Sequence, residues 1–472
     1  MDQPLTDTEA LLWSIGQDPN LATTMGLVAI LSEKPDPERL RVTVAATVRA
    51  VERLHQRVVN PSLASGGLGR PMWIADHQFE LDHHFRIARI GTGRAATDAE
   101  LRRAAAQFIN DPFDLARPLW QFQLVTGLAR GRAALLGKVH HSISDGLGLL
   151  RLAANLLEFE ADAPAPESID IDAELAAVHD VADQGEEKST PERLFNWLQS
   201  TAQGLQSTAQ GLPDPKKLVE AGAEAVQSAR TISENLPKSG GSPLWSTRSR
   251  NRRLELLAVP AQSLRDRAED LGVTINDLYV AACAQAAVHY HKEHGVDLPS
   301  ITATVVVSTQ PASQQDPPDE AQLTENAFVP VAITLPGSDA SADERLEVVR
   351  SEVWKRRTQL KEKGDGLGLI TALGGLVPSS IAASLAVDQA AKVDFATSNI
   401  PGPPVPTWLA GTPVERLYPI GPVSGTAFNV TLMTYDQEAL FGLHLDPAAV
   451  SDGNLLKLSL GQGLSDFGVA RR

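Results

Sequence analysis

The stretch that decides the fold reads His140-His141-Ser142-Ile143-Ser144-Asp145-Gly146. Before it, residues 133–139 are mostly apolar and predict a buried strand, and after it apolar residues recur at helical spacing over 149–157. The histidine pair is therefore predicted to lie on a strand-to-helix turn. Such a turn presents side chains at the carboxyl end of a sheet, where open α/β folds bind ligands.

A histidine at this position suits acyl transfer. Moving an acyl group from a thioester to an alcohol requires a base of near-neutral pKa to take the hydroxyl proton, and imidazole is that base. The imidazolium then returns the proton to the departing thiolate, which contributes roughly 10²–10⁴ in rate. The residues alone leave a structural alternative open, in which Asp145 caps the following helix and the histidines are partly buried polar residues.

The heptad resembles the HHxxxDG signature shared by chloramphenicol acetyltransferases, condensation domains and the wax ester synthase/diacylglycerol acyltransferase family. Three further stretches resemble the LDxxRPLW, TxND and SNxPGP motifs of the last family, in the same order: Asp111 to Trp120, Val273 to Asp277, and Ser398 to Pro403. Weaker similarity at 5–13 and 71–73 extends the resemblance over nearly the whole chain. It implies an α/β fold of two chloramphenicol-acetyltransferase-like lobes, with mixed sheets flanked by helices and an active-site tunnel at the lobe interface.

Length and composition agree with two lobes. A chain of 472 residues is too long for one core, and 43% hydrophobic with 21% charged residues is an ordinary globular composition. We expect an N-terminal lobe at 1–160 with the histidine motif, an acidic and helical linker at 161–245, and a C-terminal lobe at 246–472. An acidic run over 158–188 favours the linker.

Alternating strand and helix patterns in both halves predict α/β layering. The predicted strands lie at 27–31, 84–90, 120–125 and 133–139 in the first half, and at 254–259, 301–307, 327–335, 393–397, 428–434 and 440–445 in the second. Predicted helices of the second half lie at 262–271, 275–291 and 344–360.

The resemblance assigns the general-base role to His141, places His140 at the pocket wall and lets Asp145 hold the local geometry. It gives Asn276 to oxyanion stabilisation, a role that the first turn of a helix favours. The remaining residues expected to contact substrate are Gly146, Asp277, Ser398 and Asn399. Asp277 also fits a capping box with Thr274, which is a purely structural role.

The chain departs from the family pattern at two positions. Gln310 stands where family members commonly have the arginine that pairs with the motif aspartate, so Arg117 or neutral hydrogen bonds would have to hold Asp145. Glu9 stands where the N-terminal motif usually has aspartate. These departures concern substrate preference more than reaction class.

Other classes of protein are disfavoured. A net charge of −16 argues against nucleic-acid binding. The single cysteine, Cys283, and the absence of a leader pattern in residues 1–10 predict a reducing cytosol. No metal site is expected at the histidines and aspartates of 76–84, because strand alternation would send His83 and His84 to opposite faces. The chain also lacks HExxH and GxSxG motifs.

We therefore expect an O-acyltransferase that takes acyl-CoA as co-substrate, needs no cofactor or metal, and esterifies diacylglycerol or a long-chain alcohol. A carrier-protein-dependent condensation-like acyltransferase and an inactive lipid-droplet binding relative remain alternatives. The expected location is the cytoplasm, with peripheral contact to the inner membrane or lipid droplets. The linker and the uncharged window 366–387 are the candidates for that contact, since glycines, a proline and serines make the window unfit to span a membrane.

Overall fold

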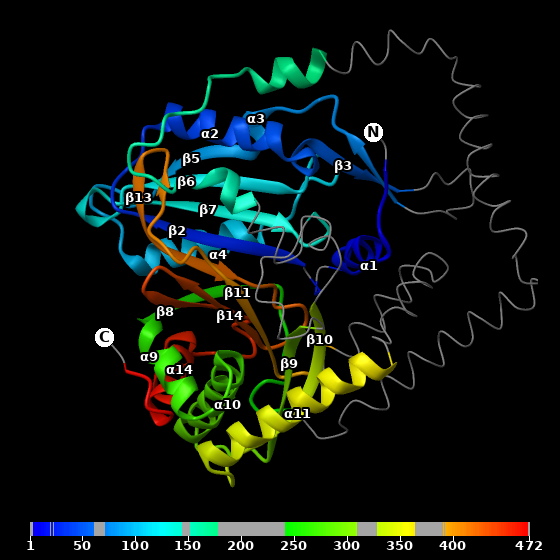
Figure 1. Cartoon of the computed structure of the whole chain (residues 1–472), viewed down its shortest axis with the longest axis vertical. Helices are drawn as coiled ribbons and strands as arrows, with labels where there is room; N and C mark the ends of the chain where they lie inside the picture. The colour runs from blue at the N-terminus through cyan, green and yellow to red at the C-terminus, as the bar shows by residue number, and fades with distance from the viewer. Residues whose placement is uncertain are drawn as a thin grey trace, which may run out of the picture.

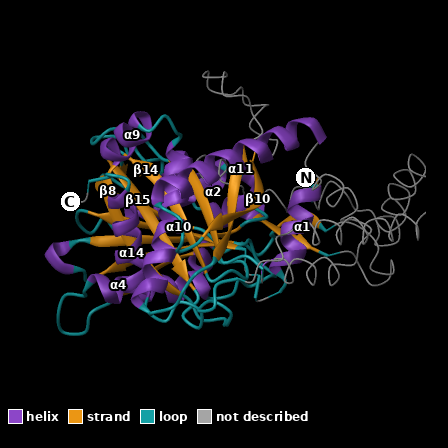
Figure 2. Ribbon diagram, turned by 90° about the horizontal axis from the view of Figure 1, so that it is seen from below, coloured by secondary structure: helices purple, strands orange, loops and turns teal. Residues whose placement is uncertain are grey.

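Two six-stranded sheets and one three-stranded sheet organise the chain. The computed structural model describes residues 3–18, 20–21, 23–60, 71–143, 152–177, 241–308, 328–363, 390 and 392–470. Each large sheet supports one lobe, with the N-terminal lobe above and the C-terminal lobe below in Figure 1. Helices lie on both sides of the strands in Figure 2, so the α/β prediction is confirmed.

The first sheet has the strand order β12-β13-β2-β7-β6-β5. Its strands are β2 (Thr24–Leu31), β5 (Phe85–Arg89), β6 (Trp120–Thr126), β7 (Ala133–His140), β12 (Trp408–Leu409) and β13 (Thr412–Ile420). The helices of this half are α1 (Asp7–Gly16), α2 (Pro37–Ala50), α3 (Leu81–His84) and α4 (Asp98–Asn110). A three-stranded sheet, β1-β4-β3, comprises β1 (Gln3–Pro4), β3 (Gln56–Val59) and β4 (Met72–Ala75).

The second sheet has the order β10-β9-β11-β14-β15-β8 and is mixed, since β11 runs parallel to β9 and β14 while the other pairs are antiparallel. Its strands are β8 (Arg253–Pro260), β9 (Ser300–Ser308), β10 (Phe328–Pro336), β11 (Phe395–Pro401), β14 (Phe428–Tyr435) and β15 (Glu438–Leu445). The helices of this half are α9 (Ala261–Asp270), α10 (Ile275–Glu293), α11 (Ala342–Lys363) and α14 (Gly453–Asp466). Each strand and helix predicted for this half has its counterpart here, within a few residues.

The two halves of the chain are interleaved at β13. This strand falls within 246–472, which the sequence assigns to the second lobe, yet it pairs antiparallel with β2 and extends the first sheet. Its side chains Leu417 and Tyr418 belong to the hydrophobic core of the first lobe. Beneath it, Gly442 of β15 passes so close that an added Cβ would lie 1.9 Å from the carbonyl oxygen of Pro419. Close backbone contact therefore joins the two sheets at this crossing.

The sequence does not predict β13, because Pro413 and Pro419 interrupt its apolar pattern and proline is disfavoured inside a sheet. The structure accommodates them with a very short neighbour, β12, on one side and a register shift between Val414 and Arg416 on the other.

His83 and His84 are not in a strand, which corrects the predicted start of the 84–90 strand. They end the short helix α3, and β5 begins only at Phe85. The His84 ring is stacked between Phe79 and Trp120, and its Nδ1 lies 2.8 Å from the Trp120 carbonyl oxygen. These tertiary contacts hold His84 at the end of α3, although the local sequence pattern predicts a strand.

Among the described residues, no single helix is long and apolar enough to cross a membrane. The pair α9 and α10 meets the length and composition only when taken together, and it is bent by 100° at the break.

Candidate active site

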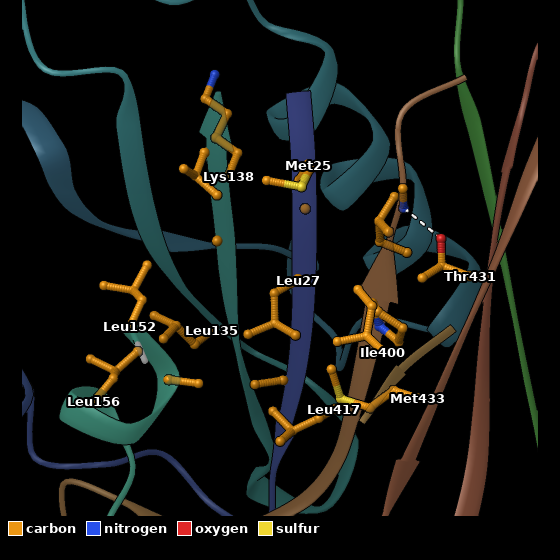
Figure 3. A pocket seen from close by; sticks show the side chains of 18 of the residues that line it. Met25, Leu27, Leu135, Lys138, Leu152, Leu156, Ile400, Leu417, Thr431 and Met433 are labelled. Atoms are coloured by element: carbon orange, nitrogen blue, oxygen red, sulfur yellow. Dashed lines mark hydrogen bonds between the residues drawn. The ribbon is translucent and has the colours of Figure 1, made fainter. Parts of the chain in front are cut away.

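A deep apolar cavity of about 1200 Å³, its mouth included, lies on the face of the first sheet opposite α4. Strands β2, β7 and β13 form its floor, the helical residues 152–156 cover one side, and β11 and β14 of the second sheet close the other (Figure 3). Most of its walls are aliphatic, including Leu27, Leu135, Leu156, Leu417 and Met433. The cavity is thus built by both lobes.

Among the described residues, two ionisable side chains line this cavity, those of His141 and Lys138. The residue follows β7 directly, and its backbone N–H donates to the carbonyl oxygen of Thr23, 3.1 Å away. Lys138 directs its ammonium group away, because Nζ donates to the Asp111 carbonyl oxygen at 2.7 Å and lies over the ring of Phe113. Because an imidazole ordinarily titrates near neutral pH, His141 is the candidate for proton transfer at this cavity.

His140 is a buried residue with both ring nitrogens engaged. The backbone N–H of Ser142 donates to its Nδ1, so the proton is on Nε2, which donates to the Thr23 hydroxyl at 2.8 Å. Burial, with a smaller contribution from the neighbouring His141, lowers the pKa of His140 to about 4. The ring does not line the cavity and makes edge contacts with Trp13 and Phe113 instead. It stays neutral and anchors the turn.

The Pro118-Leu119-Trp120 segment holds the histidine turn from the other side. The carbonyl oxygen of Leu119 accepts the backbone N–H of His140 at 2.9 Å. Trp120 lines the cavity, and its indole N–H donates to the Leu54 carbonyl oxygen at 2.7 Å. The family-like segment thus positions the histidine motif by main-chain pairing.

The helical residues 152–156 are fixed to the β12–β13 turn by Glu158. The carboxylate of Glu158 accepts the Gly411 N–H at 2.7 Å and pairs with Arg39 at 2.8 Å, and its backbone pairs with Trp408 at 2.8 Å in both directions. Arg39 and Glu158 are 25% and 11% exposed, which shields this ion pair from solvent. Elements from three parts of the chain therefore hold the cavity wall in place.

Asn276, Asp277 and Asn399 line a separate cavity, between α10 and α11. Asp277 forms the capping box anticipated from the sequence, since its carboxylate accepts the Thr274 N–H and hydroxyl while its own N–H donates to the Thr274 hydroxyl. Of the second-lobe residues expected at the substrate, only Ser398 reaches the cavity of His141. The structure thus divides the expected site residues between two neighbouring cavities.

Asp145, Gly146 and Gln310 lie outside the described residues, as do the window 366–387 and most of the linker. Arg117, the alternative partner for Asp145, contacts Glu80 at 3.6 Å and Asp114 at 3.8 Å. Glu9 caps α1 in a capping box with Thr6. The part of the chain that the structure describes contains no cluster of three or more histidine, cysteine, aspartate or glutamate side chains suited to a metal ion.

Two residues of the site were not predicted from the sequence. Thr23 bonds His140 through its hydroxyl and His141 through its carbonyl oxygen, yet nothing in its local pattern marks it. Thr431 accepts the Gly421 N–H at 3.0 Å on the side of the cavity opposite the helical residues 152–156 (Figure 3). The contacts of both residues form only because the fold brings together strands that are distant in sequence.

Comparisons with known proteins cover nearly the whole chain. Residues 5–279 match the wax ester synthase/diacylglycerol acyltransferase catalytic domain, and 324–466 match the WS/DGAT C-terminal domain. A candidate diacylglycerol O-acyltransferase of Mycobacterium tuberculosis is 27% identical over 454 residues, which cover 95% of this chain and 88% of that protein. One from Mycobacterium bovis is 27% identical over 490 residues, covering 100% of this chain and 93% of that protein.

Solved structures share the fold. The wax ester synthase/diacylglycerol acyltransferase from Marinobacter aquaeolei VT8 superposes with a TM-score of 0.65 at 20% identity, over 98% of both chains. The first condensation domain of the CDA synthetase superposes with a TM-score of 0.60 at 16% identity, over 100% of this chain and 98% of that one. The expected two-lobe, condensation-like architecture is confirmed.

Proposed function

This chain belongs to the wax ester synthase/diacylglycerol acyltransferase family and is an acyltransferase of that type, and from that premise we propose the following reaction. A long-chain acyl group moves from acyl-CoA to the hydroxyl of a lipid alcohol, with His141 as general base. One observation carries the proposal: His141 is at a mostly apolar cavity of about 1200 Å³, its mouth included, that both lobes build. Such a cavity suits an alkyl chain, whose burial contributes about 0.8 kcal/mol per methylene.

The proton balance of the reaction needs no acyl-enzyme. The His141 imidazole takes the hydroxyl proton of the alcohol as its oxygen bonds to the thioester carbonyl carbon. The carbon–sulfur bond then breaks, and the imidazolium gives the proton to the leaving thiolate. His141 is regenerated, and the products are an ester and free CoA.

The other motif residues receive supporting roles in this proposal. His140 fixes the turn through Thr23 and Ser142 and carries no positive charge at neutral pH. Asp145 keeps its predicted role of holding the local geometry and Gly146 that of contacting substrate, and Ser398 contacts the acyl donor where it meets the cavity.

Asn276 lines the neighbouring cavity and not that of His141. Its predicted role in oxyanion stabilisation therefore needs a separate test. For Asn276→Ala, a lower kcat with unchanged KM for acyl-CoA supports oxyanion stabilisation. A higher KM for acyl-CoA with unchanged kcat assigns Asn276 to donor binding instead.

Diacylglycerol is the first acceptor we propose, in line with the names of the mycobacterial relatives, and a long-chain alcohol is the second. Both dissolve in lipid, so we place the working enzyme at the cytoplasmic face of the inner membrane or on lipid droplets. Flotation of the protein with vesicles that contain diacylglycerol tests this location. Protein that stays at the bottom of the gradient contradicts it.

The decisive experiment supplies palmitoyl-CoA with dioleoylglycerol or hexadecanol and follows both thiol release and ester formation. Wild type should release one thiol per ester formed, and His141→Ala should lose roughly 10²–10⁴ in kcat while unfolding at the same denaturant concentration. Ester formation by His141→Ala at the wild-type rate would remove His141 from the mechanism. Ester formation from an acyl carrier protein but not from acyl-CoA would favour the condensation-like alternative.

A further inference from the structure

The second cavity, of about 1230 Å³, opens at the carboxyl ends of the parallel strands β9 and β11. Val307 of β9, Asn399 of β11 and the first turn of α10 line one side of it, and α11 lines the other. Figure 1 shows α11 running along the outside of the second lobe, beside β9 and β10. Ligands bind preferentially at the carboxyl ends of parallel strands, and a helix N-terminus there favours an anion.

Three side chains of α11 give this cavity its chemistry. Arg350, Trp354 and Arg357 are spaced by four and three residues, so they share one face of the helix, and all three line the cavity. Arg350 has Glu347 at 3.6 Å, whereas Arg357 has a buried Nε with no hydrogen-bond partner among the described residues. Trp354 is 68% exposed, which is unusual for so large an apolar ring.

The charge at the cavity favours a phosphate. Two guanidinium groups face one carboxylate, that of Asp277, and this carboxylate already accepts two hydrogen bonds from Thr274. The site is therefore locally basic on a chain whose net charge is −16. Guanidinium groups bind phosphate oxygens through paired N–H donors, and an exposed indole offers a face on which a purine can stack.

The cavity of His141 and this one are both lined by residues of strand β11. Ser398 of β11 lines the cavity of His141, and the next residue, Asn399, lines the basic one. A ligand with an apolar chain at one end and phosphates at the other matches the chemistry of the two cavities taken together. We propose that the basic cavity binds the phosphate-bearing adenosine end of acyl-CoA, with Arg357 on a phosphate and Trp354 on the adenine. This inference rests on the proposed function.

Direct binding tests the inference without turnover. Adenosine 3′,5′-bisphosphate, which lacks the acyl chain and the pantetheine arm, is titrated into the full-length protein by calorimetry. Arg357→Gln and Trp354→Ala should each weaken binding about tenfold, a typical loss for one charge-assisted contact or one stacked base. Lys355→Gln is the matched control, since Lys355 is on the same helix, pairs with Glu352 at 3.2 Å and does not line the cavity. It should bind as wild type does.

A kinetic comparison provides the second measurement. Arg357→Gln should raise KM for palmitoyl-CoA about tenfold and leave kcat/KM for palmitoyl-pantetheine, which has no nucleotide, at the wild-type value. Thermal unfolding of each variant verifies that it folds. A wild-type protein that does not bind the bisphosphate, or an Arg357→Gln variant that binds it equally well, overturns the inference.

Two further outcomes distinguish this inference from a lipid-phosphate site and from the proposed function. If Arg357→Gln loses flotation with phosphatidylglycerol vesicles but keeps bisphosphate affinity, the cavity binds a lipid phosphate and the inference is wrong. If wild type binds the bisphosphate through Arg357 but transfers no acyl group, the nucleotide site stands and the proposed function fails.

Discussion

Ser398 and Asn399 are consecutive residues of β11 that line different cavities, one apolar and one basic. Successive side chains of a strand point to opposite faces, so one strand supplies a wall to both. The apolar cavity adjoins His141 and suits the acyl chain, whereas the basic one is proposed for the nucleotide.

Ala153→Phe should shorten the acyl chain that the enzyme prefers. Ala153 is partly buried and lines the apolar cavity, so a phenyl ring there occupies volume that a long chain would need. We expect kcat/KM to fall about tenfold or more for palmitoyl-CoA and to hold for octanoyl-CoA, measured over a series of acyl-CoA lengths. Ala154→Phe is the control, because Ala154 is the exposed neighbour. An unchanged length preference in Ala153→Phe would contradict the placement of the acyl chain.

Thr23→Val should loosen the histidine turn. The substitution keeps the shape of the side chain but leaves the buried Nε2–H of His140 without its acceptor. The free energy of unfolding should fall by about 1–3 kcal/mol in urea titrations, and kcat should fall with it. Thr23→Ser retains the hydroxyl and should recover most of both. A Thr23→Val variant as stable and as active as wild type would show that this hydrogen bond does not hold the turn.

Gly442→Ala should weaken the junction between the two sheets. A Cβ at Gly442 would lie 1.9 Å from the Pro419 carbonyl oxygen, and the backbone of each residue is held in a sheet. Overpacking of this kind costs about 1–3 kcal/mol or more in the free energy of unfolding, measured by denaturant titration. Because β13 also lines the apolar cavity, activity should fall together with stability. A variant as stable as wild type would show that the sheets can separate freely here.

His84 should make stability depend on pH. Burial lowers its pKa to about 4 from the ordinary 6.5, so between these values the unfolded chain binds a proton that the folded chain excludes. Its contribution to stability is therefore complete above pH 6.5 and is lost as the pH falls towards 4. Replacement by glutamine, which does not titrate, removes this dependence.

The measurement is the free energy of unfolding of wild type minus that of His84→Gln, taken at pH 7 and at pH 5. This difference should fall by about 2 kcal/mol from pH 7 to pH 5, since one pKa unit corresponds to about 1.36 kcal/mol. A difference that stays constant over this range would mean that His84 titrates normally in the folded protein.

The sequence by itself determined the local elements and pointed to a candidate base. Strand β7 and helix α10 were readable because side-chain periodicity and the Thr274–Asp277 capping box are properties of neighbouring residues. The order of four motifs indicated the family, and with it the two-lobe fold. The same resemblance named His141 as the candidate base, because its motif is contiguous in the chain.

Only the tertiary structure decided which residues share a cavity. Adjacent histidines at the end of a strand point to opposite sides, but the side that is hollow depends on which strands and helices pack there. Here β13, from far along the chain, completes the first sheet, and the cavity forms on the face towards His141. The family motifs predicted that Asn276 and His141 share one active site, whereas packing of α10 against α11 placed Asn276 in the basic cavity. Contacts between segments hundreds of residues apart leave no periodic trace in the sequence, because each segment satisfies only its own local pattern.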